Sequence, residues 1–219
     1  MLAEALVLAE QRRSTRLASL VSGVRLRGLE QLFTYLQAAT KAYAELPALA
    51  GVAFLVERVK ADYQTALEAT LSGYQGVAAD AMRDVMEIEC LLLDFASSEG
   101  LADEWLTADE SLRRRKYMPV KVRKRLLESG IKPYANDDFE PVDYRAHSEA
   151  LHVTPSRPPI AGRGPEPLEA ELPFQEDFGF VEMFEHGSRV LMAIELLRMV
   201  ALGVPDEYEP LTQCHVACS

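Results

Sequence analysis

The sequence predicts an all-α protein, a helical bundle in which a long proline-rich loop precedes the last helix. Apolar residues recur at steps of three and four over most of the chain, which is the spacing of one face of an α-helix. No segment alternates apolar and polar residues between turn signals, as a half-buried strand would, and no tandem repeat indicates a solenoid. We therefore expect a single α-helical domain over residues 1–219.

The first half of the chain predicts three helical stretches separated by small residues and proline. Residues 2–46 predict one long helix or two, because good helix formers dominate and Gly23 and Gly28 mark either a break or a close helix contact. A proline suited to a first helical turn opens the second stretch, 47–71. The third helix, expected over 77–97, is the most apolar of the three.

The second half predicts shorter helices, an irregular loop and a long last helix. The shorter helices are expected at 101–115, 119–128 and 143–151. Six prolines and two glycines then exclude regular structure from a loop over 153–173. The last helix, 175–202, carries apolar positions on one face and ends at Gly203, which leaves a frayed tail over 204–219.

Cysteine usage and the N-terminus indicate the cytoplasm. The three cysteines, an odd number without framework spacing, fit a reducing compartment: Cys90, Cys214 and Cys218. The first residues lack the basic start of a signal peptide, and no apolar run is long enough to span a membrane. Cys214, His215 and Cys218 lack a fourth ligand and a fixed scaffold, so no metal and no cofactor is expected.

The charge distribution is uneven. The formal net charge is −11, yet residues 113–125 contain eight basic residues and no acid: Arg113, Arg114, Arg115, Lys116, Lys121, Arg123, Lys124 and Arg125. Such a cluster repels itself unless an anion lies nearby. The candidate anions are nucleic acid, a nucleotide or phosphate, and the protein's own acidic C-terminal half.

Polar residues on the third helix are expected to be structural. Glu89 shares a face with apolar residues, and a buried carboxylate needs a partner, so we expect a salt bridge to an arginine of a neighbouring helix, with a catalytic acid or metal ligand as the alternative. Arg83 and Glu87 are spaced as an ordinary helical ion pair, on a face that also carries Asp94. His186, at the edge of the apolar face of the last helix, is expected to bond a backbone or carboxylate partner.

The sequence YRAHSEALHVTP offers the one catalytic constellation that we identify. In a helix, Arg145 and His152 project from the same side, because an offset of seven residues returns to nearly the same angle. An arginine that holds a phosphate beside a histidine that takes a proton from a ribose 2′-hydroxyl can cleave RNA without a metal.

The order of these features resembles a group of prokaryotic helical proteins in the HEPN superfamily. The similarity covers about residues 77–155 and rests on Arg83 and Glu87, Trp105, the basic segment to Arg125, and the stretch from Tyr144 to Val153. The resemblance implies a bundle that dimerises so that two Arg-x4–6-His motifs face each other. It also implies that Arg145 binds the scissile phosphate and that His152 assists proton transfer.

Two functions therefore remain open. The first is a HEPN-like protein, expected as a homodimer, that binds or cleaves RNA or binds a nucleotide, with Arg145 and His152 as the active pair. The second is a non-catalytic module that engages a partner protein through the acidic C-terminal helix and the proline-rich loop. Neither requires a membrane, and whether the protein is an enzyme stays open.

Overall fold

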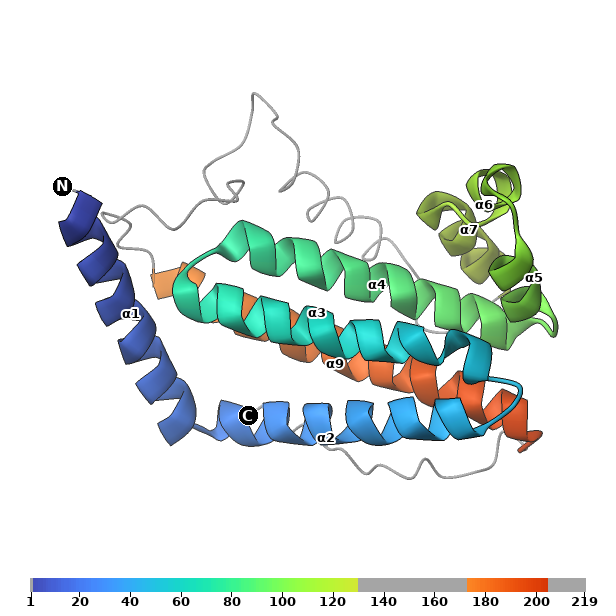
Figure 1. The fold of residues 1–219 in the computed structure, drawn as a ribbon, viewed down its shortest axis with the longest axis horizontal. Helices are drawn as coiled ribbons and strands as arrows, with labels where there is room; N and C mark the ends of the chain where they lie inside the picture. The colour runs from blue at the N-terminus through green and yellow to red at the C-terminus, as the bar shows by residue number, and fades with distance from the viewer. Residues whose placement is uncertain (1, 130–172, 205–219) are drawn as a thin grey trace.

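Four long helices form the body of the protein. The structure is a computed structural model that describes residues 2–129 and 173–204, with side chains in the second range from residue 179 onward. Within these ranges the regular structure is entirely helical, which confirms the predicted all-α class (Figure 1). The long helices are α2 (Val24–Glu45), α3 (Ala53–Ser72), α4 (Gln75–Ser97) and α9 (Pro173–Leu202).

Contacts between the helices fix their directions. Gly28 faces Phe184 and Tyr43 bonds Ile194, so α2 and α9 run parallel. Gly179, in contrast, lies against Thr70 near the end of α3, and α3 therefore runs opposite to α9. Helix α9 packs most extensively against α4 and also contacts α2 and α3, and this position explains why it is buried on several sides.

The remaining helices lie at the two ends of this body. Helix α1 (Leu2–Ser22) leaves the bundle at an angle, and Leu20 is its buried residue (Figure 1). A short 3₁₀ turn, η1 (Ala50–Val52), precedes α3. At the other end three short helices follow α4: α5 (Leu101–Thr107), α6 (Glu110–Lys116) and α7 (Pro119–Ser129).

The glycines in the first predicted stretch have different structural roles. Gly23 separates α1 from α2, whereas Gly28 lies inside α2 as a close helix contact. A β-carbon at Gly28 would lie 2.9 Å from the Phe184 ring, so a larger residue there would push α2 and α9 apart. Gly23 therefore marks a helix break and Gly28 a close helix contact, the two roles that the sequence predicted for these glycines.

Two predicted boundaries were wrong. The expected helix over 101–115 is two helices, because the Asp109 side chain caps α6 by accepting a hydrogen bond from the Leu112 amide at 2.7 Å. The second stretch becomes α-helical at Ala53, after a turn and η1, rather than at the proline in position 47. The predictions for 143–151, for the loop over 153–172 and for the tail from 205 lie outside the described residues.

Buried tyrosines connect α2 and α3 to the backbone of α9. The Tyr43 hydroxyl donates to the Ile194 carbonyl at 2.6 Å, and the Tyr63 hydroxyl donates to the Met183 carbonyl at 3.2 Å. Burial is the main cause that raises the pKa of both phenols. Both hydroxyls therefore stay protonated as donors, and these bonds fix α9 along its length.

The contact between Gly179 and Thr70 leads to a first prediction. A β-carbon at Gly179 would clash with Thr70 Oγ1 and would lie 2.7 Å from its methyl carbon, so no rotation of the buried threonine relieves the clash. We expect Gly179→Ala to lower the free energy of unfolding by up to about 2 kcal/mol, since overpacking of about 1–3 kcal/mol outweighs a gain in helix propensity of about 1 kcal/mol. Urea denaturation measures this.

Thr70→Ala provides the control, because it removes both clashing atoms and a hydroxyl oxygen that has no hydrogen-bond partner among the described residues. In the Thr70→Ala background, Gly179→Ala should lower the free energy of unfolding by much less. Equal losses in the two backgrounds would show that the close contact is not the cause.

Candidate nucleic-acid interface

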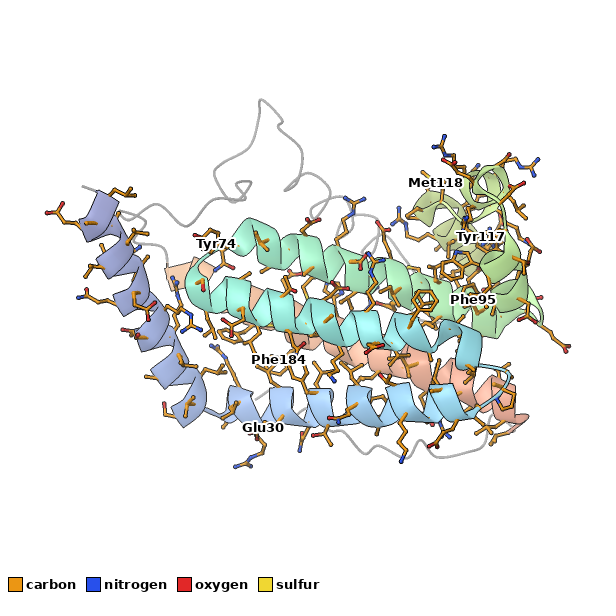
Figure 2. All side chains as sticks on the ribbon, viewed as in Figure 1. Glu30, Tyr74, Phe95, Tyr117, Met118 and Phe184 are labelled. Carbon is orange, nitrogen blue, oxygen red and sulfur yellow. The ribbon has the colours of Figure 1, made fainter. Side chains whose placement is uncertain are left out.

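The basic run folds into α6 and α7, which project from one end of the bundle. Figure 2 shows Tyr117 and Met118, between these two helices, at the end of the molecule opposite Tyr74. Helix α6 begins at an acidic cap and places its cations in the last turn, where they oppose the negative end of the helix dipole. Helix α7 buries Val122 and Leu126 and packs on α4. The local sequence thus explains both helices.

Arg125 attaches α7 to the bundle. Its guanidinium makes two bonds to the Asp94 carboxylate, from Nε to Oδ1 at 3.0 Å and from Nη2 to Oδ2 at 2.6 Å, and a third to the Lys116 carbonyl at 2.6 Å. Asp94 is fully buried on α4, and its bond to Arg125 raises the pKa of that guanidinium. Arg125 therefore binds both a buried carboxylate of α4 and the end of α6.

A second set of contacts attaches α6 to α5. Lys116 Nζ lies 2.7 Å from the Glu104 carboxylate, which also accepts a bond from the Tyr117 hydroxyl at 3.1 Å. The bond from Lys116 lowers the pKa of Glu104, and burial followed by the bond to Glu104 raises the pKa of Tyr117 to about 12. The cations of Lys116 and Arg125 both lie over the Tyr117 ring, 5.6 and 5.4 Å from its centre.

The other cations of the run face solvent to different degrees. Arg113, Arg115 and Lys121 are exposed and have no ion-pair partner among the described residues. Arg114 pairs with Glu110 and Lys124 with Glu128, each one helical turn away. Such exposed pairs contribute little, so a phosphate can replace the carboxylate. Arg123 is half-buried and has an interaction of its own.

The structure thus divides the eight predicted nucleic-acid-binding residues. Lys116 and Arg125 make internal contacts, which narrows the candidate surface to the exposed cations of α6 and α7. We name this group the basic surface: Arg113, Arg114, Arg115, Lys121 and Lys124. Among the described residues, the carboxylates that pair with cations of the run lie on α4 to α7: Asp94, Glu104, Glu110 and Glu128. The sequence pointed instead to the acidic C-terminal half as the internal source of anions.

The predicted catalytic pair cannot be placed against this surface. Arg145 and His152 lie outside the described residues, as do Cys214, His215 and Cys218 of the tail. Within the described ranges, no group of three or more His, Cys, Asp or Glu side chains is arranged to hold a metal ion. None of the helices that the structure describes is long and apolar enough to cross a membrane.

The charged residues of α4 that the sequence singled out as structural lie in ion pairs. Arg189 of α9 donates from Nε to Glu89 Oε1 at 3.2 Å, and Glu89 is fully buried. Arg83 and Glu87 form a pair one turn apart, also at 3.2 Å. On α9 the ring of the buried His186 lies 3.2 Å from the Glu182 carboxylate. The sequence predicted a salt bridge to an arginine for Glu89, a helical ion pair for Arg83 and Glu87, and a backbone or carboxylate partner for His186.

The described residues define a four-helix body that carries a projecting pair of basic helices. Comparison of the chain with protein-family models, with curated proteins and with solved structures finds no significant match in any of the three.

A carboxylate pair between α3 and α4 gives a second prediction. Burial, and then the hydrogen bond and charge of Asp84, raise the pKa of Asp62 to about 7, against the opposing effect of Arg58. An unfolded aspartate titrates near 3.9, so between these values the folded protein binds more protons than the unfolded chain. The contribution of Asp62 to stability is therefore greatest below about pH 4 and is lost as the pH rises through about 7.

Asp62→Asn removes this titration and keeps the side chain's size. We expect the variant to match the wild type near pH 4 and to exceed its free energy of unfolding by on the order of 1 kcal/mol near pH 8, where the wild-type carboxylates repel each other. Urea denaturation at a series of pH values measures the difference. A constant difference across that series would contradict the assigned pKa.

Proposed function

We propose that the protein binds RNA through the basic surface of α6 and α7, and that Arg145 and His152 cleave the bound strand without a metal. The observation that carries the binding step is the exposure of Arg113, Arg115 and Lys121 without acidic partners among the described residues. In a protein of net charge −11, such unneutralised cations favour a polyanionic ligand.

The attachment of the two basic helices adds support. Asp94 and Glu104 hold Arg125 and Lys116 in place, so the backbone beneath the exposed cations is fixed before any ligand arrives. A ligand then orders only the outer side chains, which lowers the entropy cost of binding. Arginine suits this role because its planar fork bonds phosphate oxygens at two points.

The alternative of an interaction module that uses the acidic C-terminal helix has less support. The described part of α9 packs inside the bundle, and two of its three carboxylates with described side chains, Glu182 and Glu195, have partners there. Glu195 accepts bonds from Tyr35 at 3.0 Å and from Arg198, whose bond lowers the pKa of Glu195. Glu182 lies beside His186. These acids are engaged within the fold and are poorly placed to recruit a basic partner.

Binding is tested with a fluorescent single-stranded RNA and the double variant Arg113→Glu/Arg115→Glu. We expect its affinity to fall at least about tenfold, and the slope of log affinity against log salt to shrink by about 1.4, since each phosphate contact contributes about 0.7. Fluorescence anisotropy over a salt series measures both quantities.

The matched control is Arg27→Glu/Lys41→Glu, which changes two exposed cations of α2 and alters the net charge equally. This control should bind almost as tightly as the wild type. If it loses as much affinity as the α6 variant, net charge governs binding and the basic surface has no special role.

Cleavage is tested separately, by incubating labelled RNA in EDTA with the wild type and with His152→Ala. Cleavage that the variant loses would support the catalytic pair. Binding by both proteins without cleavage by either would reduce the function to RNA binding.

A further inference from the structure

Helix α1 exposes many large apolar side chains. Six of them are exposed: Leu2, Leu6, Val7, Leu8, Leu17 and Val21. Helix α4 has a similar length and all of its residues are described, yet it exposes none. Figure 1 shows that α1 leaves the bundle at an angle, so much of its length stands away from the other long helices. Exposed apolar surface of this kind marks an interaction site.

Four of these residues lie along one side of α1, with two charged residues between them. We name this set the α1 stripe: Leu2, Leu6, Glu10, Arg13, Leu17 and Val21. Steps of three and four residues keep all six within about 100° around the helix axis. The exposed fraction of the apolar members ranges from 37% at Leu17 to 75% at Leu2. The stripe is therefore apolar at both ends and charged in the middle.

The order of residue types in the α1 stripe is the same in both directions along the helix. When a second copy of α1 lies antiparallel to the first, Leu6 faces the partner's Leu17, and Leu2 faces the partner's Val21. A two-fold axis at the middle of α1 generates each of these contacts twice. A surface that is complementary to itself in this way is what a two-fold symmetric dimer requires.

The charges in the middle of the stripe favour the antiparallel direction. In that arrangement Glu10 faces the partner's Arg13, and the reverse contact follows by symmetry. A parallel pair would instead place Glu10 opposite the partner's Glu10, so that like charges would repel. Arg13 also bonds Glu68 of α3 at 3.0 Å, but a guanidinium has five N–H donors and can bond a second carboxylate.

We propose that the α1 stripe binds the α1 stripe of a second copy of this chain in the antiparallel direction. This dimer differs from the one that the HEPN resemblance implies, in which two Arg-x4–6-His motifs face each other. Figure 1 shows α1 and the basic helices α6 and α7 at opposite ends of the molecule. The interface therefore lies apart from the basic surface and does not depend on RNA binding there.

Sedimentation velocity of the full chain over a series of protein concentrations tests the association. A single pair of helices forms a small interface, so the mass should rise with concentration from 24.4 kDa toward twice that value. Leu6→Glu/Leu17→Glu places carboxylates in both central apolar contacts, and this variant should stay at the mass of one chain wherever the wild type is dimeric. Circular dichroism checks that it is folded.

The matched control is Met192→Glu/Val200→Glu, which adds the same charge at two exposed apolar residues of α9. This variant should dimerise like the wild type. The proposal is overturned if the wild type has the mass of one chain at every concentration, as it would if another segment or another protein covered the stripe. It is also overturned if the α9 variant loses the dimer as completely as the α1 variant does.

Disulfide cross-linking tests the direction of the two helices. Cys214→Ser/Cys218→Ser provides the background, since the remaining Cys90 is buried. Antiparallel pairing brings position 6 to position 17 of the partner, whereas two copies of position 6 lie about 16 Å apart along the helices. A disulfide joins Cα atoms about 4.4–6.8 Å apart. A mixture of Leu6→Cys and Leu17→Cys should therefore cross-link, and neither variant alone should. Cross-linking of Leu6→Cys alone would show parallel pairing and contradict the proposal.

Discussion

Replacing Arg189 with methionine is expected to lower the free energy of unfolding by about 3–5 kcal/mol. The arginine pairs with Glu89, which is fully buried between α4 and α9, whereas the arginine side chain itself is 15% exposed. Methionine fills most of the volume but leaves the carboxylate without its cation in the core. Urea denaturation followed by far-ultraviolet circular dichroism measures the loss.

The double variant Glu89→Met/Arg189→Met separates the charge effect from packing. Replacing both partners of a buried ion pair with apolar residues is often neutral or stabilising, because the desolvation cost disappears along with the attraction. We therefore expect the double variant to recover most of the stability that Arg189→Met loses. A double variant as unstable as the sum of the two single variants would show that the pair does not act as a unit.

Arg125→Met is expected to have a comparable effect at the other end of α4, a loss of about 3–4 kcal/mol. It removes three hydrogen bonds and leaves the fully buried Asp94 without its cation. Asp94→Asn should lower the free energy of unfolding by less than Arg125→Met does. The Arg125 side chain is 29% exposed, so water can solvate its charge when the carboxylate is gone. Urea denaturation of both variants tests this asymmetry.

Arg115→Met is the matched control within the same basic run. Its side chain is exposed and has no ion-pair partner among the described residues, so its loss should change stability by less than about 0.5 kcal/mol. RNA affinity should show the opposite pattern. Under conditions in which both proteins are folded, Arg115→Met should bind RNA more weakly than the wild type. Equal stability losses for Arg115→Met and Arg125→Met would contradict the division of the run into anchoring and exposed cations.

This division matters for function because the sequence presents the eight cations as one cluster. Their net charge and spacing predict an anionic partner but not which side chains can reach it. The structure assigns Arg125 and Lys116 to Asp94 and Glu104, on neighbouring helices. Reversing the charge of all eight residues would therefore unfold the protein as well as weaken binding, and the two effects could not be separated. Variants of Arg113 and Arg115 should weaken binding without unfolding.

The fold class and most of the helices follow from the amino-acid pattern alone. Apolar steps of three and four fix which face of each helix is buried, and glycine ends the helices at Gly73 and Gly203, where the backbone adopts positive φ. Local signals also predicted the pair of Arg83 and Glu87, since one helical turn separates the two residues. For Glu89 the cost of burying a carboxylate predicted an arginine partner, although the identity of that arginine did not follow.

The tertiary structure decided every pairing between residues distant in sequence. Arg189 lies 100 residues from Glu89, and Arg125 lies 31 residues from Asp94. No local spacing encodes such contacts, because they depend on how the helices run and cross. The periodicity of apolar residues determines which face of each helix is apolar. The packing of the helices determines which of these faces come into contact.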